Sequence, residues 1–279
     1  MRINRLSLLN SLFSVINENN QGDSYFVLAH YFLEHYRGLD TLNIYDVADE
    51  CFVSRASVRR FCQSIGYDNF KDLKSDTYSF DEEFKDDVNH FYRPDYREHL
   101  TASIHSMLEE LNRRMDNEGV DRFVERLHNS RNIVFITSNT TTARIRDFQQ
   151  AMIICNKVVR LVSEMYTDNE LLESLDERDC LITVSSSGRL AYAAKDIVKN
   201  SKAYKFLITV NRDQSFLENY DRVFHLSAND LSMEKSVYGK YGIDYMFDVV
   251  YSTYIQKYDS EIQRLKGERE CFPFENKEK

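Results

Sequence analysis

Three consecutive serines followed by a glycine, in the stretch VSSSGR at residues 184–189, have the side chains of an anion-binding loop. They come directly after an apolar run at residues 181–184 and before a segment with helical periodicity. Hydroxyl groups beside the free N–H groups of a helix N-terminus bind phosphate or carboxylate without a strong cation. We therefore predict a ligand site at Ser185, Ser186, Ser187 and Gly188. Serines are also common as plain loop and capping residues after strands, and this alternative stays open.

A second hydroxyl-rich loop, TSNTTTA at residues 137–143, lies between a predicted strand and a predicted helix. In a doubly wound parallel sheet, ligands bind beyond the carboxyl ends of the strands, where both loops are expected. This adds Ser138, Asn139 and Thr141 to the candidate ligand-binding residues. Gly188 is the only glycine between residues 121 and 238, so the glycine patterns of dinucleotide-binding turns and P-loops do not occur there. Nucleotide binding is disfavoured.

A short cationic helix is predicted to begin after Ser54, its N-cap. Apolar residues at positions 58, 61 and 62 mark its buried side, and basic and hydroxyl side chains project from the other side. A helix of this kind on a tight turn suits insertion into the major groove of DNA. The candidate DNA-binding residues are Ser54, Arg55, Ser57, Arg59, Arg60, Lys71 and Lys74. The solvated face of an ordinary three-helix domain would carry similar charges, so this alternative also stays open.

Composition limits the kinds of partner. The chain has 279 residues and a net charge of −9, so nucleic acid must be contacted through a local cationic surface rather than through the field of the whole protein. No apolar stretch approaches the ~20 residues of a membrane helix, and we expect no membrane association. The five cysteines are scattered without a CxxC pair, which favours a reducing compartment. We expect a cytoplasmic protein.

The chain is expected to contain a helical part and an α/β part. An acidic segment at residues 79–97, which includes Pro94, is the predicted linker. After a helical segment at about residues 100–129, five β-rich runs alternate with helical stretches: NIVFIT, KVVRLV, CLITVS, KFLITV and RVFHLS. This alternation predicts a doubly wound parallel sheet. We expect an α + α/β protein with a helix-turn-helix domain at residues 1–78, a linker at 79–105, an α/β domain at 106–267 and a flexible tail at 268–279.

The run IYDVADECFVSRASVRRFCQSIGYDNFKDLK at residues 44–74 resembles the N-terminal helix-turn-helix of the RpiR family of bacterial regulators. The resemblance covers about the first quarter of the chain. It implies DNA binding through the helix that begins after Ser54. The matching residues are Val53, Ser54, Ala56, Ser57, Val58, Arg60, Phe61, Cys62, Gly66, Tyr67, Phe70, Lys71, Leu73 and Lys74.

Residues from about 132 to 254 resemble a sugar isomerase (SIS) domain, the usual second half of RpiR-type regulators, whose ligands are phosphosugars. The stretch DCLITVSSSG at residues 179–188 fits the family's strand followed by Ser-x-Ser-Gly, so Ser185 and Ser187 inherit a phosphate-binding role. The first family loop reads Gly-x-Gly-x-Ser. Here Thr137 and Asn139 stand at the glycines and Thr141 at the serine. The sequence also has Leu190 where the family often has threonine.

Catalytic chemistry has few candidates. Sugar isomerisation needs a base such as Glu or His, and only His225 and Glu164 lie near predicted strand ends. His225 fits better as a sheet residue. No His/Asp pair is ordered around Cys180 or Ser187, and no HxxxH or HExxH motif occurs. We expect no catalytic residues, no metal site, no cofactor and no enzymatic activity.

These features predict a DNA-binding transcriptional regulator that senses a phosphorylated sugar and controls carbohydrate-metabolism genes. A homodimer or higher homo-oligomer on a palindromic operator is expected, because one short recognition helix makes few contacts. The apolar stripe of a predicted long helix at residues 241–267 offers a surface for dimerisation or for the domain core. Two alternatives remain: a phosphosugar isomerase-like enzyme, and a regulator whose vestigial SIS domain serves only dimerisation.

Overall fold

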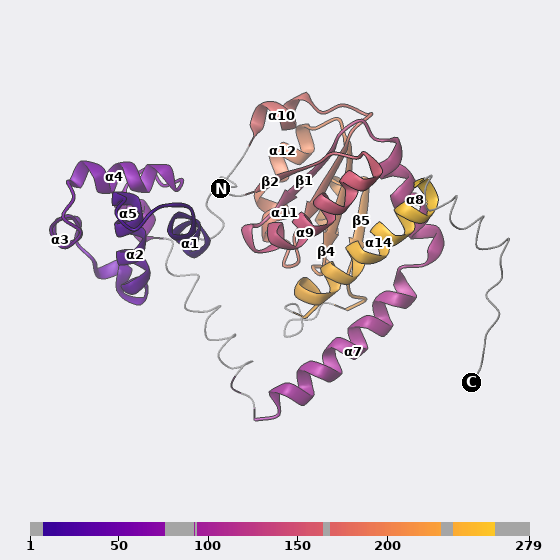
Figure 1. Ribbon diagram of the computed structural model, residues 1–279, viewed down its shortest axis with the longest axis horizontal. Coiled ribbons are helices and arrows are strands. Elements are labelled where there is room, and N and C mark those ends of the chain that lie inside the picture. The colour runs from indigo at the N-terminus through magenta and orange to yellow at the C-terminus, as the bar shows by residue number, and fades with distance from the viewer. Residues whose placement is uncertain (1–7, 76–91, 93, 164–167, 230–236, 260–279) are drawn as a thin grey trace.

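The computed structural model describes residues 8–75, 92, 94–163, 168–229 and 237–259, except the side chains of residues 139 and 140. Its N-terminal part is helical (Figure 1). The helices of this part are α1 (Leu8–Glu18), α2 (Ser24–Glu34), a 3-10 helix (Tyr36–Thr41), α3 (Ile44–Glu50), α4 (Arg55–Ser64) and α5 (Phe70–Lys74).

Side-chain caps set where four of these helices begin. Asp23, Asn43, Ser54 and Asn69 each lie just before a helix and accept a hydrogen bond from a backbone N–H of its first turn. Such caps satisfy N–H groups that have no partner within the helix. The caps Asn43 and Ser54 therefore fix where α3 and α4 begin, and the turn between these helices ends at Ser54, where the cationic helix starts.

An aromatic cluster forms the core of the helical part. The ring of Phe61 on α4 lies 5.7 Å from Phe32 and 5.5 Å from Tyr25, both on α2. Phe70 on α5 stacks on Phe32 at 5.8 Å. Buried aromatic side chains are the largest apolar contributors to a core of this size. They hold α4 by its apolar side and leave its basic side to solvent.

The second part is a five-stranded sheet in the order β2-β1-β3-β4-β5, with every neighbouring pair parallel. The strands are β1 (Ile133–Thr137), β2 (Val159–Ser163), β3 (Cys180–Val184), β4 (Tyr204–Thr209) and β5 (Arg222–His225). All five predicted β-rich runs are strands. The predicted fold class, a helical helix-turn-helix part followed by a doubly wound parallel sheet, is confirmed.

Helices cover both faces of the sheet (Figure 1). One core joins the sheet to α7 (Tyr96–Arg114), α8 (Asn117–Asn129), α9 (Asn139–Met152) and α14 (Ile243–Tyr258). The other joins it to α10 (Asn169–Ser174), α11 (Arg189–Ala193) and α12 (Lys195–Asn200). Alternate side chains of one strand enter opposite cores, as Leu181 and Ile182 of β3 do. This explains why the central strands β1 and β3 are buried at every residue rather than at alternate ones.

Two predicted helical segments differ in detail from the structure. The segment at 100–129 is two helices. α7 ends at Arg114, and Asp116 accepts a hydrogen bond from the Gly119 N–H as the N-cap of α8. The long C-terminal helix begins at Ile243, after a π-helical turn at Tyr238–Gly242, and its predicted end lies outside the described residues. The apolar stripe of this helix is core of the α/β part rather than free surface: Ile243, Met246, Phe247, Val250 and Tyr254 are buried there.

In the part of the chain that is described, no helix is long and apolar enough to cross a membrane.

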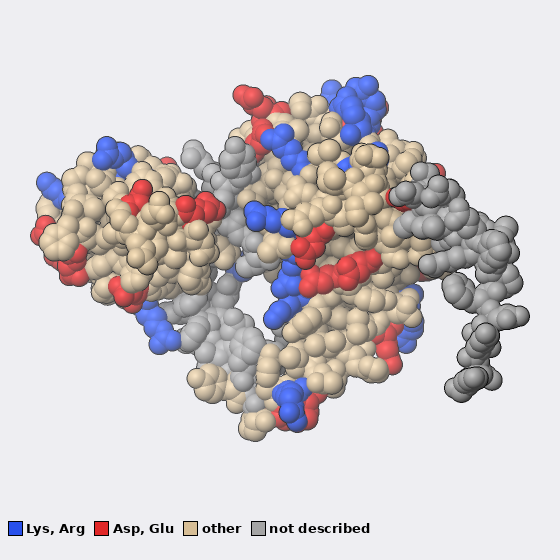
Figure 2. Space-filling view, in the orientation of Figure 1, with Lys and Arg blue, Asp and Glu red and all other residues tan. Residues whose placement is uncertain are grey.

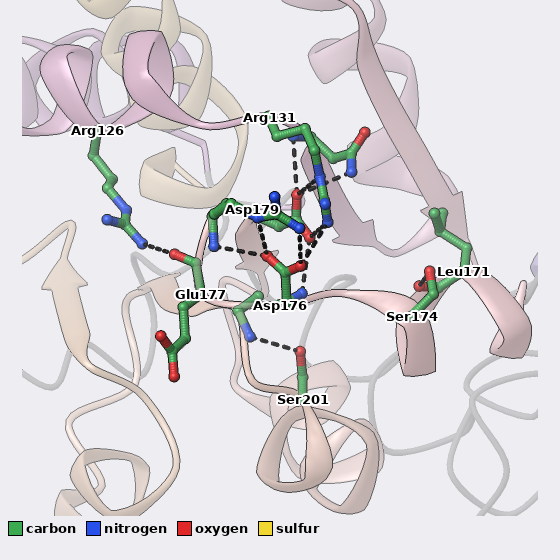
Figure 3. A network of polar contacts seen from close by, with 11 residues as sticks. Arg126, Arg131, Leu171, Ser174, Asp176, Glu177, Asp179 and Ser201 are labelled. Carbon is green, nitrogen blue, oxygen red and sulfur yellow. Dashed lines mark hydrogen bonds and ion pairs between the residues drawn. The ribbon is translucent and has the colours of Figure 1, made fainter.

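A buried carboxylate organises the start of the central strand (Figure 3). The side chain of Asp179, which is 0% exposed, accepts two hydrogen bonds from Arg131 at 3.0 and 2.6 Å. It also accepts from the backbone N–H groups of Asn132 and Asp176 and from the Asn132 amide. Burial works to raise the pKa of Asp179, but these hydrogen bonds and the charge of Arg131 outweigh it, and the pKa lies below its ordinary value.

We expect Asp179→Asn to destabilise the α/β part by about 2 kcal/mol, since it removes the buried charge that pairs with Arg131 and leaves Asp176 as the remaining carboxylate beside that guanidinium. Because the folded-state pKa is lowered, the contribution is present above the unfolded value of about 4 and is lost as the pH falls below it. Urea unfolding followed by circular dichroism from pH 7 to pH 3 measures both. Asp196→Asn, at an exposed site, is the control. Equal stabilities of the two variants at pH 7 would contradict the assigned role.

Candidate functional site

The exposed side of α4 carries the cationic surface that the sequence predicts. Arg55, Arg59 and Arg60 are exposed, and Val58, Phe61 and Cys62 are buried on the opposite side. Figure 2 shows basic side chains at the outer edge of the helical part near α4, further basic side chains at its lower edge, and acidic side chains between them. A local cationic surface therefore exists within an acidic chain.

The hydroxyls on this helix are partly engaged within the protein. Ser54 Oγ accepts from the Ser57 N–H at 3.1 Å and lies 2.9 Å from Ser57 Oγ. Arg60 Nη2 donates to Ser57 Oγ at 3.3 Å. The Arg55 guanidinium lies over the Tyr45 ring, 4.7 Å from its centroid. Among the three arginines, Arg59 is the one for which no such contact is found within the described chain.

The two predicted lysines differ in their surroundings. Lys71 is exposed on α5. Lys74 is half-buried, and its Nζ donates to the backbone carbonyl of Leu42 at 2.7 Å and lies 5.6 Å from the Phe70 ring centroid. Lys74 therefore links α5 to the segment before α3, which is a positioning role within the domain.

The serine loop follows β3 and is tied to the end of β4. The Ser185 N–H donates to the Ile208 carbonyl at 2.9 Å, and the Ser186 carbonyl accepts from the Val210 N–H at 3.0 Å. The Asn211 amide donates to the Ser187 carbonyl at 2.9 Å. These hydrogen bonds fix the backbone of the loop against the end of β4 and the residues that follow it. Ser185 is 6% exposed, and Ser186 and Ser187 are half-buried.

Gly188 is required by this loop geometry. Its φ is +85°, and a Cβ at this position would lie 2.7 Å from Asn211 Nδ2 and 3.0 Å from Phe216 Cζ. Any other residue here would be strained by the left-handed backbone conformation, and its Cβ would also clash with the Asn211 amide. Leu190, two residues on, is 3% exposed and packs in the core with α10 and α12, so its role is packing.

The hydroxyls of the second loop bond to one another. Thr137 Oγ1 lies 2.5 Å from Thr142 Oγ1, and Ser138 Oγ lies 2.9 Å from Thr141 Oγ1. Ser138 occupies the N-cap position of α9 but makes no side-chain cap bond. The side chain of Asn139 lies outside those described. Two of the predicted ligand residues, Ser138 and Thr141, are thus close together, and Thr141 is buried.

The two loops lie side by side at the point where the strand order reverses. Thr137 at the end of β1 pairs with Val184 at the end of β3, so Ser138 and Ser185 leave adjacent strands at the same edge. The order 2-1-3-4-5 has its switch point between β1 and β3, which is where doubly wound sheets bind ligands. The tertiary structure therefore brings both predicted loops to one site.

Two residues at this site were missed by sequence reasoning. Asn211 follows β4 and fixes the serine loop through its side chain. Gly239, on the π-helical turn, packs so closely that an added Cβ would lie 2.8 Å from Ser186 Cβ. The paired glycines of VYGKYG at residues 237–242 were the available signal for a close backbone approach.

The catalytic candidates are not arranged around the serine loop. His225 Nδ1 lies 3.0 Å from the Asn211 carbonyl, and burial together with the charge of Arg212 lowers the pKa of this histidine. Cys180 lies at the opposite end of β3 from Ser185, and burial raises the pKa of its thiol to about 12. Glu164 lies outside the described residues. In the described ranges, no group of three His, Cys, Asp or Glu side chains is placed to hold a metal ion.

Comparison with known proteins identifies the N-terminal part. Residues 4–79 match the model of the helix-turn-helix domain of the rpiR family. A helix-turn-helix-type transcriptional regulator of Providencia stuartii is 23% identical over 167 residues, which are 58% of this chain and 59% of that protein. The chain thus spans about three fifths of the length of this curated relative.

Two solved structures are similar over longer stretches. The Vibrio vulnificus NanR protein complexed with ManNAc-6P has a TM-score of 0.49 at 19% identity, over 94% of this chain and 98% of that one. The sugar isomerase domain of an RpiR transcription factor from Sphaerobacter thermophilus has a TM-score of 0.46 at 12% identity, over 62% of this chain and 98% of that one.

The fold and the cationic α4 define a helix-turn-helix protein with a doubly wound α/β second part. The helix-turn-helix domain at residues 4–79 belongs to the rpiR family. The resemblance noted at residues 44–74 is thereby confirmed.

We expect Gly188→Ala to destabilise the α/β part by about 2 kcal/mol, because alanine is disfavoured at positive φ and its Cβ would displace Asn211. Urea unfolding followed by circular dichroism measures the change. Gly22→Ala is the matched control, since no atom lies within 4 Å of the Cβ it would add. Unchanged stability in Gly188→Ala would show that the loop adjusts at little cost.

Proposed function

We propose that this protein is a transcriptional regulator that binds DNA through α4 and senses a phosphorylated sugar at the paired loops after β1 and β3. The observation that carries the proposal is the exposed arginine side of α4 within a helix-turn-helix domain of the rpiR family. Such a regulator works in the cytoplasm. It binds a palindromic operator as a homodimer, because two half-sites double the contacts of one short helix.

The ligand class is argued from the chemistry of the loops. Ser185, Ser186 and Ser187 supply hydroxyls beside a backbone held by Asn211 and β4. The N-terminus of α9, a helix of 14 residues, lies at the same edge of the sheet. Hydroxyls and helix N–H groups together favour a phosphate. The resemblance of residues 132–254 to a SIS domain supports a sugar as the rest of the ligand.

Sensing is favoured over catalysis because the serine loop has groups that bind an anion, while His225 and Cys180, the catalytic candidates among the described residues, are not part of that loop. Moving a proton between adjacent carbons requires a base within hydrogen-bond reach of the substrate. His225 is bonded to the Asn211 carbonyl, and Cys180 lies at the far end of its strand. We propose that the protein is not an enzyme. A ligand would then act by favouring one arrangement of the paired DNA-binding domains, through a differential affinity of roughly 1–3 kcal/mol.

DNA binding is tested with Arg59→Ala and Arg60→Ala in the full-length chain. The probe is a duplex enriched from a random library by the unmodified protein, and fluorescence anisotropy gives the affinity. We expect each variant to bind about tenfold more weakly, with a shallower dependence on salt if the lost contact is to phosphate. Arg222→Ala, an exposed arginine on β5, is the control. Unchanged affinity in both α4 variants would overturn the assignment of the recognition helix.

Ligand binding is tested by thermal shift with inorganic phosphate and a panel of pentose, hexose and amino-sugar phosphates. We expect one sugar phosphate to raise the melting temperature, and the rise to be lost in a Ser185→Ala, Ser187→Ala double variant. A Ser174→Ala, Ser252→Ala double variant, at exposed sites outside the two loops, should keep it. No shift across the panel, or equal shifts in all three proteins, would count against the serine loop as a sensor.

A further inference from the structure

Phe52, in the turn between α3 and α4, is both strained and exposed. Its φ is +53°, and its side chain is 96% exposed. One other non-glycine residue of the described chain, Asn156, has a positive φ. Asparagine tolerates this conformation, whereas phenylalanine is rarely found in it. An aromatic side chain at such a position is therefore unusual in two independent respects.

The fold itself does not use the Phe52 side chain. The turn is closed by backbone bonds, from the Phe52 N–H to the Asp49 carbonyl at 3.2 Å and from the Val53 N–H to the Ala48 carbonyl at 2.9 Å. A glycine would make both bonds without the steric cost of the left-handed conformation. The neighbouring Val53 packs against the domain core, while the Phe52 ring does not. Strain that the fold does not require points to a functional role.

The surroundings of Phe52 favour a polyanion as its partner. On its C-terminal side the next residues are the cap Ser54 and the arginine side of α4, with no acidic residue between positions 51 and 67, whereas Asp49 and Glu50 precede it at the end of α3. Tyr45, 55% exposed, lies beneath the guanidinium of Arg55. An exposed apolar group beside a cationic helix N-terminus matches the major groove, where phosphates surround thymine methyl groups.

We propose that Phe52 extends the DNA-binding surface beyond α4 and makes an apolar contact with the 5-methyl group of a thymine at one position of the operator. This inference rests on the proposed DNA binding by α4. It assigns sequence preference to a residue of the turn, in addition to the arginines of the helix. The contact is uncharged, so it acts on sequence discrimination and not on the salt dependence of binding.

The test compares Phe52→Gly and Phe52→Asn with the unmodified full-length protein on the enriched duplex. Both replacements accept positive φ and remove the ring. We expect both to bind about tenfold more weakly, equivalent to about 1.4 kcal/mol, with an unchanged salt slope. Phe52→Gly should also melt about 3 °C higher, because strain is relieved. Weaker binding in a more stable protein excludes unfolding as the cause.

A thymine-to-uracil exchange in the same duplex identifies the contacted base. Removing one methyl group should weaken binding by the unmodified protein about threefold at a single position, and should not affect Phe52→Gly. Two controls should bind as the unmodified protein does. Asn156→Gly changes the other positive-φ residue, and Leu217→Ala removes another exposed apolar side chain.

The outcomes separate this inference from the proposed function. If the unmodified protein enriches no duplex from the library, DNA binding itself fails. If it binds and the Phe52 variants bind equally well, DNA binding stands and the role of Phe52 is refuted. If the Phe52 variants bind more weakly but no uracil exchange distinguishes them from the unmodified protein, the thymine contact is refuted.

Discussion

The central strand β3 is the constraint on which the α/β part depends. All five of its residues are buried, so every side chain must be accommodated in one core or the other. Its backbone groups pair with β1 and β4, and Asp179 at its start fixes Arg131 and the segment before β1. Because the strand is held along its whole length, the loop at its far end is held too. The serine loop takes its shape from this support.

The charge of this protein is unevenly distributed: the chain is acidic overall, but α4 carries exposed arginines that can contact DNA. With a net charge of −9, long-range forces between the whole protein and DNA are repulsive. The arginines of α4 counter this only within about a Debye length, roughly 8 Å at physiological salt. Binding of DNA must then depend on close contacts and their geometry.

The candidate ligand site has the groups that anion recognition requires. Its hydroxyls and N–H groups can hold an anion in place, and among the described catalytic candidates Cys180 lies at the far end of β3 and His225 Nδ1 lies 3.0 Å from the Asn211 carbonyl oxygen. Asn211 connects the serine loop to His225, since its side chain contacts one and its carbonyl contacts the other.

Local periodicity in the sequence determined much of the architecture. Five β-rich runs became five parallel strands, and helical spacing after Ser54 predicted the cationic helix, because both signals are local. The resemblance to the RpiR family identified that helix as part of a helix-turn-helix. The sequence also indicated the two hydroxyl-rich loops. It predicted that both lie beyond the carboxyl ends of strands. It could not reveal that their two strands are direct neighbours, because that follows from the strand order, nor that Asn211 and Gly239 support the loops.

The use of individual side chains was decided by the tertiary structure alone. Lys74 bonds to the Leu42 carbonyl, the hydroxyls of the second loop bond to one another, and the stripe of α14 is buried in the core. The positive φ of Phe52 likewise cannot be predicted from its residue type. Each of these depends on contacts between residues, or on a backbone angle, that no local pattern specifies. Composition and spacing determined what this protein could bind, and packing decided which side chains remain available to bind it.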